Sequence, residues 1–150
     1  MFDKLAPVRT IMTEDVICVE PDTIMTEVAK LFESRNVHHI PVVDQGKVLG
    51  IISTTDFYKL EHHFTLFRTH QAKEMNEAIF RSLLAKEVMR APVATVRTSD
   101  TVQYAADIFK ENLFHALPVV DEQKKIVGII TPYDLMVYAF GAEYLVEAHQ

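Results

Sequence analysis

Two short segments of the chain combine hydroxyl side chains with a carboxylate, directly after a glycine and two isoleucines. They read GIISTTD at 50–56 and GIITPYD at 128–134. Free backbone N–H groups at the start of a helix favour a bound anion, and Ser53 and Thr55 add hydroxyl donors there. Asp56 falls in the first helical turn, where its carboxylate could accept both hydrogen bonds of a vicinal diol, as an acidic side chain does for ribose in dinucleotide-binding folds. The segments therefore indicate a site for a nucleotide-like ligand, with apolar strand residues around the base.

Structural roles for the same side chains stay open. Asp56 and Asp134 could be residues that the helix dipole stabilises at a helix N-terminus. Ser53 and Thr131 could be simple N-caps. Capping and ligand binding are both compatible with the spacing.

An internal duplication accounts for the recurrence of the motif. Residues 12–44 align with residues 89–121 at an offset of 77, and one inserted residue extends the alignment to the pair Asp56 and Asp134. Fifteen aligned pairs are identical, among them a histidine, a proline, a glycine and an aspartate. Repeats of this length are supersecondary units that bury a shared core. We therefore expect that neither copy folds well alone.

Each copy predicts the order strand, helix, strand, strand, helix. Short β-branched runs at 16–19 and 93–96 predict the first strands, and the turn Asp44–Gly46 predicts a hairpin between the next two. A capping residue is expected before the first helix of each copy. The candidate caps are Asp22 or Thr23 in the first copy and Ser99 or Asp100 in the second. The predicted fold class is α/β (α+β), with two βαββα repeats packed about a pseudo-twofold axis.

Apolar helical patterns extend beyond the repeats, at 58–84 and 135–145. Apolar helical surface in excess of what a core needs is typical of an oligomer contact. The predicted division is 8–60 for the first repeat, 61–84 for a helical connector, 85–139 for the second repeat and 140–150 for a C-terminal helical tail.

The motifs of both copies resemble those of cystathionine-β-synthase (CBS) domains. VRTIM at 8–12 and AKEVM at 85–89 resemble the lead-in of the family, and HHIPVVD at 38–44 and HALPVVD at 115–121 resemble its central strand. GIISTTD and GIITPYD resemble its signature. The resemblance covers 8–139 and identifies the chain as a tandem CBS pair, a stand-alone Bateman module. It implies an adenosyl ligand such as AMP, ADP, ATP or S-adenosylmethionine.

The resemblance also implies two composite clefts, in which the signature of one copy faces the first strand and the central histidine of the other. The first cleft would consist of Ser53, Thr55, Asp56, Val93, Ala94, Thr95, His115 and Pro118. The second cleft would consist of Thr131, Tyr133, Asp134, Val16, Ile17, Cys18, His38, His39 and Pro41. The clefts are unequal, because Ala116 replaces the second histidine in one of them, and Pro132 and Tyr133 interrupt the hydroxyl run in the other. Either cleft could be empty.

We predict that nucleotide binding is tighter at pH 6 than at pH 8. The resemblance places His38 and His115 against a phosphate, although both could instead be structural histidines at a strand start. Unperturbed histidine is mostly neutral at pH 7, and a bound phosphate favours its protonated form. Isothermal titration with a nucleotide across this range measures the effect, and a flat pH profile would exclude both side chains as phosphate partners.

The function expected from this pattern is regulatory binding without catalysis. The chain contains no G-x-S-x-G elbow, no Walker A loop and no H-E-x-x-H motif. A ligand that prefers one arrangement of the copies would shift their equilibrium, and the signal would pass to a separate partner or to a homodimer formed through the helices. The alternative is a ligand-free interaction module of the CBS type, which the departures at Ala116, Pro132 and Tyr133 favour. A third possibility is slow hydrolysis of a bound nucleotide.

Composition argues against several other classes. The chain has 150 residues and a net charge of −6, which opposes nucleic acid binding. No apolar run approaches the roughly 18–20 residues that span a membrane, and the N-terminus lacks a signal-peptide pattern, so we expect a cytoplasmic protein. Cys18 is expected to be a small apolar side chain. No metal site and no catalytic cofactor are expected, because His62, His63 and His70 lack the spacing of a zinc site on a helix.

Overall fold

The computed structural model describes the backbone of residues 2–63 and 70–147, and the side chains of residues 2–61 and 73–141. The chain divides into two compact units. The central unit is Ile17–Val93, and the terminal unit is Met1–Val16 together with Ala94–Gln150. Each unit therefore combines the body of one repeat with the lead-in of the other.

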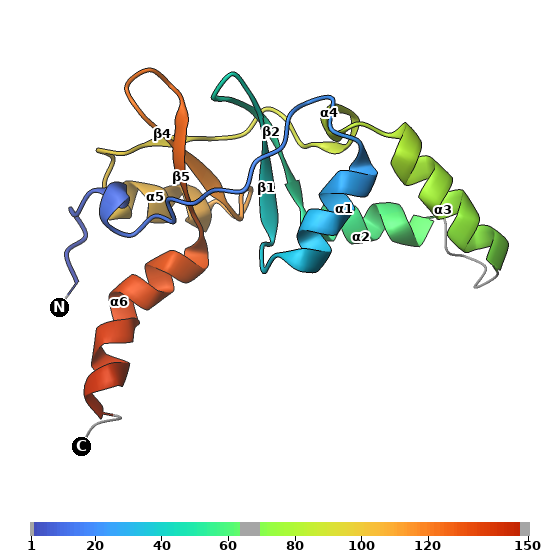
Figure 1. Ribbon diagram of the computed structural model, residues 1–150. Coiled ribbons are helices and arrows are strands. Elements are labelled where there is room, and N and C mark those ends of the chain that lie inside the picture. The colour runs from blue at the N-terminus through green and yellow to red at the C-terminus, as the bar shows by residue number, and fades with distance from the viewer. Residues whose placement is uncertain (1, 64–69, 148–150) are drawn as a thin grey trace. The chain divides into compact units, whose positions relative to one another are not determined.

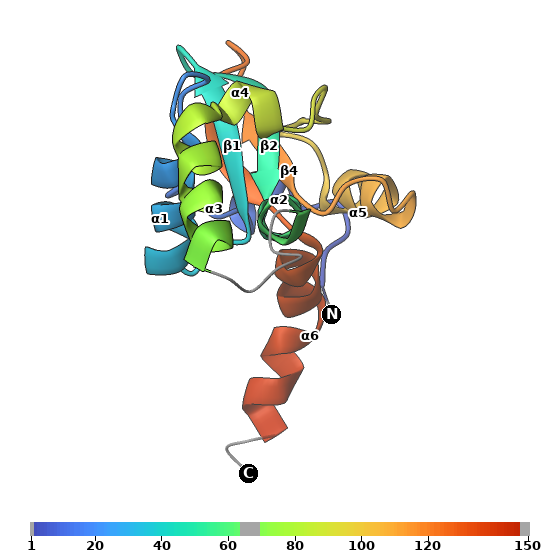
Figure 2. The same cartoon turned by 90° about the vertical axis from the view of Figure 1, so that its right-hand side faces the viewer.

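The central unit is built on an antiparallel hairpin. Strand β1 (His39–Asp44) pairs with β2 (Lys47–Ser53), and Figures 1 and 2 show two of the helices, α1 and α3, side by side within this unit. The helices of this unit are α1 (Met25–Ser34), α2 (Thr54–His63), α3 (His70–Ser82) and α4 (Ala85–Val88).

The hairpin predicted at Asp44–Gly46 is confirmed. Gln45 and Gly46 have φ angles of 50° and 83°. A two-residue turn with both φ angles positive matches the twist of the strands that it joins. The turn fixes the register, and this register places His39 opposite Ser53 at the far end of the hairpin.

The terminal unit contains a second hairpin with an added parallel strand. Strand β3 (Val96–Arg97) pairs parallel with β4 (Leu117–Val120), which pairs antiparallel with β5 (Ile126–Ile130). The helical segments of this unit are η1 (Val8–Thr10), α5 (Val102–Lys110) and α6 (Pro132–Glu147). The predicted mixed α/β class, with one hairpin in each copy, is confirmed.

The lead-in segments pair with the last strand of each unit in the same way. In the terminal unit, Thr13 and Ile129 exchange two backbone hydrogen bonds, both of 2.9 Å. In the central unit, Arg90 and Ile51 exchange the equivalent two bonds, at 2.9 and 3.1 Å. Thr13 and Arg90 are 77 positions apart, the offset of the repeat. The duplication seen in the sequence therefore extends to how each lead-in is held.

Each unit has a hydrophobic core of its own. The central core consists of Val19, Met25, Val28, Ile40, Val42, Ile52, Phe57 and Ala85, and the terminal core of Val8, Val96, Ala105, Leu117, Val119 and Ile130. Ala85 and Val8 are equivalent lead-in residues, and both are fully buried. Burial of an aliphatic side chain such as that of Val8 stabilises a fold by about 1.5–3 kcal/mol, so the lead-in is part of the core that it joins.

The strand predicted at 16–19 was wrong. Only Val19 pairs there, through one parallel bridge to Val42. In the second copy, the predicted strand 93–96 is displaced to Val96–Arg97. Strand propensity reflects how β-branched side chains pack on a pleated surface more than backbone pairing, and Val16–Cys18 is partly buried without forming a ladder.

The N-caps predicted for α1, Asp22 or Thr23, were also wrong. The helix begins after Ile24, which makes no side-chain cap. The N–H of Met25 instead donates to the carbonyl of Leu83 at 2.8 Å. The carbonyl of Leu83, which is distant in sequence, thus accepts the hydrogen bond from a helix-start N–H that a capping side chain would otherwise accept.

The caps predicted for α5, Ser99 or Asp100, were wrong by one or two residues. Thr101 is the N-cap, and its hydroxyl accepts a hydrogen bond of 3.1 Å from the N–H of Tyr104. The carboxylate of Asp100 accepts from the N–H of Arg97 at 2.7 Å. Asp100 therefore closes the turn before the helix, which is a common use of aspartate.

The apolar helical patterns are confirmed where the structure describes them. Helices α2 and α3 occupy most of the described part of 58–84, and α6 contains 135–145. Residues 64–69 lie outside the described part of the chain. None of the helices in the described ranges combines the length and the apolar character that crossing a lipid bilayer requires.

Candidate functional site

The residues predicted for each cleft are divided between the two units. The central unit contains Ile17, Cys18, His38, His39, Pro41, Ser53, Thr55, Asp56 and Val93. The terminal unit contains Val16, Ala94, Thr95, His115, Pro118, Thr131, Tyr133 and Asp134. The composite clefts stay a prediction, because the contacts of the candidate residues are described within each unit separately.

Ser53 and Asp56 form a reciprocal cap at the start of α2. The hydroxyl of Ser53 donates to Oδ2 of Asp56 at 2.8 Å and accepts from the N–H of Asp56 at 3.1 Å. The N–H of Ser53 donates to the same Oδ2 at 3.4 Å. This is the capping-box arrangement, with aspartate in the place of glutamate. The capping role that the sequence left open is therefore confirmed for this pair.

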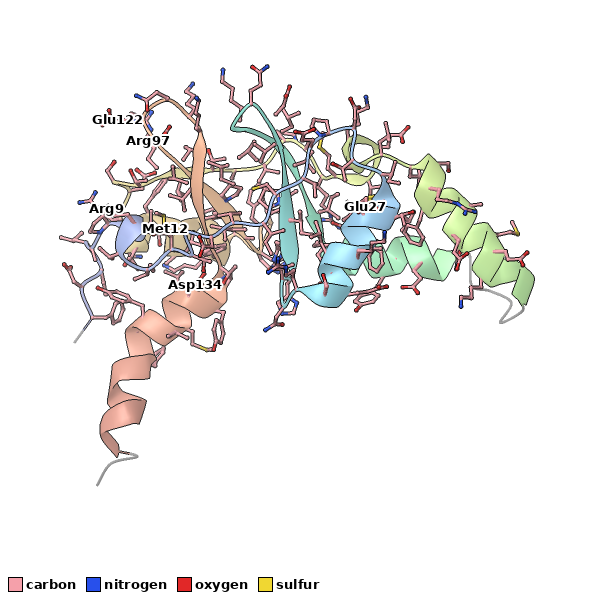
Figure 3. All side chains as sticks on the ribbon, in the orientation of Figure 1. Arg9, Met12, Glu27, Arg97, Glu122 and Asp134 are labelled. Carbon is pink, nitrogen blue, oxygen red and sulfur yellow. The ribbon has the colours of Figure 1, made fainter. Side chains whose placement is uncertain are left out.

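Thr131 and Asp134 repeat the arrangement at the start of α6. The N–H and the hydroxyl of Thr131 donate to Oδ2 of Asp134 at 2.7 and 2.9 Å. The N–H of Asp134 donates back to the hydroxyl at 3.4 Å. Figure 3 shows Asp134 where β5 runs into α6. Pro132 occupies the first helical position, where a missing N–H costs nothing, so this departure from the first signature preserves the cap.

A cation holds the second oxygen of Asp56. Nε and Nη2 of Arg90 lie 3.0 and 2.9 Å from Oδ1. The Asp56 side chain is 12% exposed, whereas that of Arg90 is 65% exposed. Arg90 belongs to the lead-in segment that pairs with Ile51 of β2. The lead-in thus brings a guanidinium to the signature carboxylate of the central unit.

Sequence reasoning missed Arg90. The equivalent residue of the other copy is Thr13, next to the matched pair Met12 and Met89. The signal in the sequence that could have identified this residue is the arginine at a position where the other copy has a threonine. Its partner was not predictable, because Asp56 lies 34 residues away and only the pairing of the lead-in with β2 joins them.

The environment of Asp56 favours its charged form. Burial of the side chain raises the pKa of the carboxyl, but hydrogen bonds from Ser53 and Arg90, together with the charge of Arg90, outweigh burial and hold this pKa below its usual value. A carboxylate that is more acidic in the folded protein than in the unfolded chain stabilises the fold once it is ionised.

Replacing Asp56 with Asn is expected to lower the free energy of unfolding near neutral pH by about 1 kcal/mol, through loss of a cap and an ion pair. The contribution of Asp56 is complete above the unfolded-state pKa, near 3.9, and is lost as the pH falls through the lower folded-state pKa. Urea unfolding at several pH values should show the gap between the two proteins closing below about pH 4. Asp15→Asn, at an exposed position, is the control. A gap of the same size at pH 3 and at pH 7 would contradict the assignment.

His38 and His39 lie beside the signature of their own unit. The N–H of Thr54, the first residue of α2, donates to the carbonyl of His38 at 2.9 Å. His39 lies opposite Ser53 in the hairpin register, and residues opposite each other in an antiparallel pair share a face of the sheet. The side chain of His38 is exposed. The central unit therefore places two histidines next to its own helix start, a proximity that the sequence did not predict.

The remaining predicted residues differ in exposure. Pro41 and Pro118 are fully buried in β1 and β4, whereas His115, Thr55, Thr95 and Tyr133 are exposed. The segments 16–18 and 93–94 are partly buried.

Burial raises the pKa of the Cys18 thiol, which suits the apolar role expected for it. Within the described side chains no group of three histidine, cysteine or acidic residues could hold a metal ion; the side chains of His62, His63 and His70 lie outside them.

Comparisons of the sequence and of the structure with known proteins point to the same family. The model of the CBS domain matches residues 8–63 and 85–141. MJ1225 of Methanocaldococcus jannaschii is 35% identical over 137 residues, which cover 91% of this chain and 48% of MJ1225. The solved structure of MJ1225 superposes with a TM-score of 0.73 over 92% of this chain and 49% of that one. The chain thus spans about half the length of MJ1225 and a smaller share of other curated relatives.

Two of the similar solved structures contain adenosyl compounds. CBSX2 of Arabidopsis thaliana, in complex with AMP, is 25% identical with a TM-score of 0.72, covering 91% of this chain and 98% of that one. The CBS domain pair of MJ0100, in complex with 5′-methylthioadenosine and S-adenosyl-L-methionine, is 26% identical with a TM-score of 0.69, covering 93% and 98%. On the two matched segments and these similarities, the chain belongs to the CBS domain family, with two CBS domains in tandem.

Proposed function

We propose that this chain is a regulatory module that binds an adenosyl ligand and passes its occupancy to a partner protein or to its own oligomer. The observation that carries the proposal is the duplicated helix start, in which a hydroxyl and a carboxylate follow a buried strand at Ser53 and Asp56 and again at Thr131 and Asp134. Such a carboxylate suits a ribose diol.

The proposal of an adenosyl ligand is supported by relatives of the chain, and not by an identified residue that recognises the base. CBSX2 binds AMP, and the MJ0100 pair binds 5′-methylthioadenosine and S-adenosyl-L-methionine. A ribose diol is common to AMP, ADP, ATP and S-adenosylmethionine. Asp56 and Asp134 would accept hydrogen bonds from its two hydroxyls. We propose the predicted cleft residues as the contacts, with His38 and His115 facing the phosphate.

Binding without catalysis is the role that the two signatures favour. The hydroxyls of Ser53 and Thr131 each donate to their own signature carboxylate. A nucleophilic hydroxyl needs a neighbouring base whose protonation couples to the reaction, whereas a carboxylate below its usual pKa is a weak base. Asp56 is in that position, so it is poorly suited to act as a general base.

Thermal unfolding against AMP, ADP, ATP, S-adenosylmethionine, NAD, GTP and cyclic dinucleotides tests the proposal. A ligand at a hundred times its dissociation constant adds about 2.7 kcal/mol to the free energy of unfolding. Stabilisation by adenosyl compounds and not by GTP is the expected result. If none of the compounds stabilises the protein, the chain is a ligand-free interaction module, which is the alternative function.

We also propose a homodimer that forms through helices. Within the part of α6 whose side chains the structure describes, four large apolar side chains are exposed: Tyr133 at 67%, Met136 at 53%, Val137 at 47% and Phe140 at 65%. Their spacing of three, four and seven residues places them on one face of the helix, and Figures 1 and 2 show α6 extending away from the sheet of its own unit. A contiguous exposed apolar face of this kind usually marks a protein interface.

Replacing Phe140 with Asp is expected to convert the dimer to a monomer, because a buried unpaired charge costs more than the interface can offset. Light scattering coupled to size exclusion measures the mass. Leu113→Asp is the matched control, since Leu113 is an apolar residue of the same unit that is 73% exposed and lies outside α6. A Phe140→Asp variant that keeps the mass of a dimer would contradict this surface.

A further inference from the structure

The two signature carboxylates differ in how many of their acceptor sites are occupied. A carboxylate offers about four lone-pair sites. Asp56 has four donors within reach: the N–H and hydroxyl of Ser53 at Oδ2, and Nε and Nη2 of Arg90 at Oδ1. Asp134 receives two, both from Thr131 and both at Oδ2. Among the residues that the structure describes, none donates to Oδ1 of Asp134.

The difference comes from one residue of the lead-in. Arg90 and Thr13 have equivalent backbone positions, because each is paired with the first isoleucine of its signature, Ile51 or Ile129. The side chain of Arg90 reaches the carboxylate of its unit. Threonine is too short and carries no charge. The arginine of the second copy therefore occupies Oδ1 of Asp56. The threonine of the first copy leaves Oδ1 of Asp134 available as an acceptor.

We propose that Arg90 closes the Asp56 carboxylate to a vicinal diol, so that an adenosyl ligand binds first at Asp134 and reaches Asp56 only when Arg90 leaves. This inference rests on the proposed function. The two hydroxyls of a ribose need two acceptor sites, which Asp134 offers at Oδ1 and Asp56 offers only after Arg90 has withdrawn. The chain then has one strong and one weak site.

Arg90 is able to withdraw. Its side chain is 65% exposed, whereas that of Asp56 is 12% exposed, so the guanidinium can return to water while the carboxylate stays in place. Ion pairs with one exposed partner are weak. The pair therefore lowers the affinity at Asp56 by a modest factor, at most about fivefold, and does not abolish binding there.

Exchanging the two lead-in residues tests the inference. Isothermal titration of the full chain with AMP is compared with 2′-deoxy-AMP, which lacks one hydroxyl of the diol. In Arg90→Thr, binding at the weak site should tighten by up to about fivefold, and the gain should be smaller for 2′-deoxy-AMP. In Thr13→Arg, the strong site should weaken by a similar factor. Arg81→Thr, which removes the same charge from an exposed position on α3, should change neither site.

The outcomes separate this inference from the proposed function. If Arg90→Thr weakens AMP binding, Arg90 holds the ligand and the inference is wrong, although the chain still binds an adenosyl compound. If Asp56→Asn removes the strong site and Asp134→Asn does not, the order of the sites is wrong. Absence of AMP binding in the wild type and in Arg90→Thr, with both proteins folded by circular dichroism, would overturn both proposals.

Discussion

Replacing Asp134 with Ala is expected to weaken the binding of AMP at least about a hundredfold. The variant removes the acceptor of two ribose hydroxyls, and hydrogen bonds to a charged group contribute about 1.5–3 kcal/mol each. Loss of two such bonds amounts to about 3 kcal/mol or more, and each 1.4 kcal/mol is a factor of ten in affinity. Isothermal titration or equilibrium dialysis with AMP measures the change.

Asp56→Ala is the matched control for this prediction. Both variants remove the aspartate of a capping box, so each should lower the free energy of unfolding by about 1 kcal/mol. Because Arg90 occupies Asp56, the control should change the strong site less than about threefold. Equal losses in the two variants would contradict the assignment of the ribose to Asp134, and an unchanged affinity in Asp134→Ala would exclude this carboxylate as a ligand contact.

Replacing Gly50 with Ala is expected to destabilise the protein by about 1–3 kcal/mol, the usual cost of inserting a methyl group into a filled space. A Cβ at Gly50 would lie 2.5 Å from Sδ of Met89 and 2.7 Å from the carbonyl oxygen of Arg90. The methionine can move, but the carbonyl accepts the N–H of Ile51 in the pairing of the lead-in. Relief of the clash therefore requires the lead-in to separate from β2.

Gly128 and Gly141 provide graded controls. A Cβ at Gly128 would lie 2.5 Å from Sδ of Met12 but 3.1 Å from the carbonyl of Thr13, so the flexible side chain can absorb more of the strain. In Gly141→Ala, within α6, the added Cβ would lie 3.3 Å from Val137, and the variant should gain up to about 1 kcal/mol of helix propensity. Thermal unfolding should show the largest loss of stability in Gly50→Ala, a smaller loss in Gly128→Ala and no loss in Gly141→Ala. Equal stability of the first variant and the wild type would show that the lead-in is not tightly packed on β2.

Local elements were predictable where a pattern had a direct physical reading. The turn at Gln45 and Gly46 follows from a sequence that tolerates positive φ, and the apolar period predicted α1 and α6. A capping role for Ser53 and a place in the first helical turn for Asp56 were each foreseen, because both residue types are common at helix starts. Each of these depends on residues within a few positions of one another.

Features that depend on distant segments were not predictable in the same way. The N-terminus of α1 needs no capping side chain because Leu83 supplies the acceptor for Met25. Val16–Cys18 has the composition of a strand but finds no ladder beyond the single bridge at Val19. The contact between Arg90 and Asp56 depends on the pairing of the lead-in with β2. The sequence pattern of a single repeat does not predict that pairing.

A crystal structure of the full chain, grown with AMP at a concentration that fills only the stronger site, would show directly which carboxylate holds the ribose. We expect AMP with its ribose hydroxyls on Oδ1 of Asp134, while Arg90 still contacts Asp56. AMP on Asp56 with Arg90 displaced and Asp134 vacant would contradict the order of the sites. Crystals that contain no AMP, although the nucleotide saturates the solution, would contradict the proposal that this CBS pair binds an adenosyl ligand.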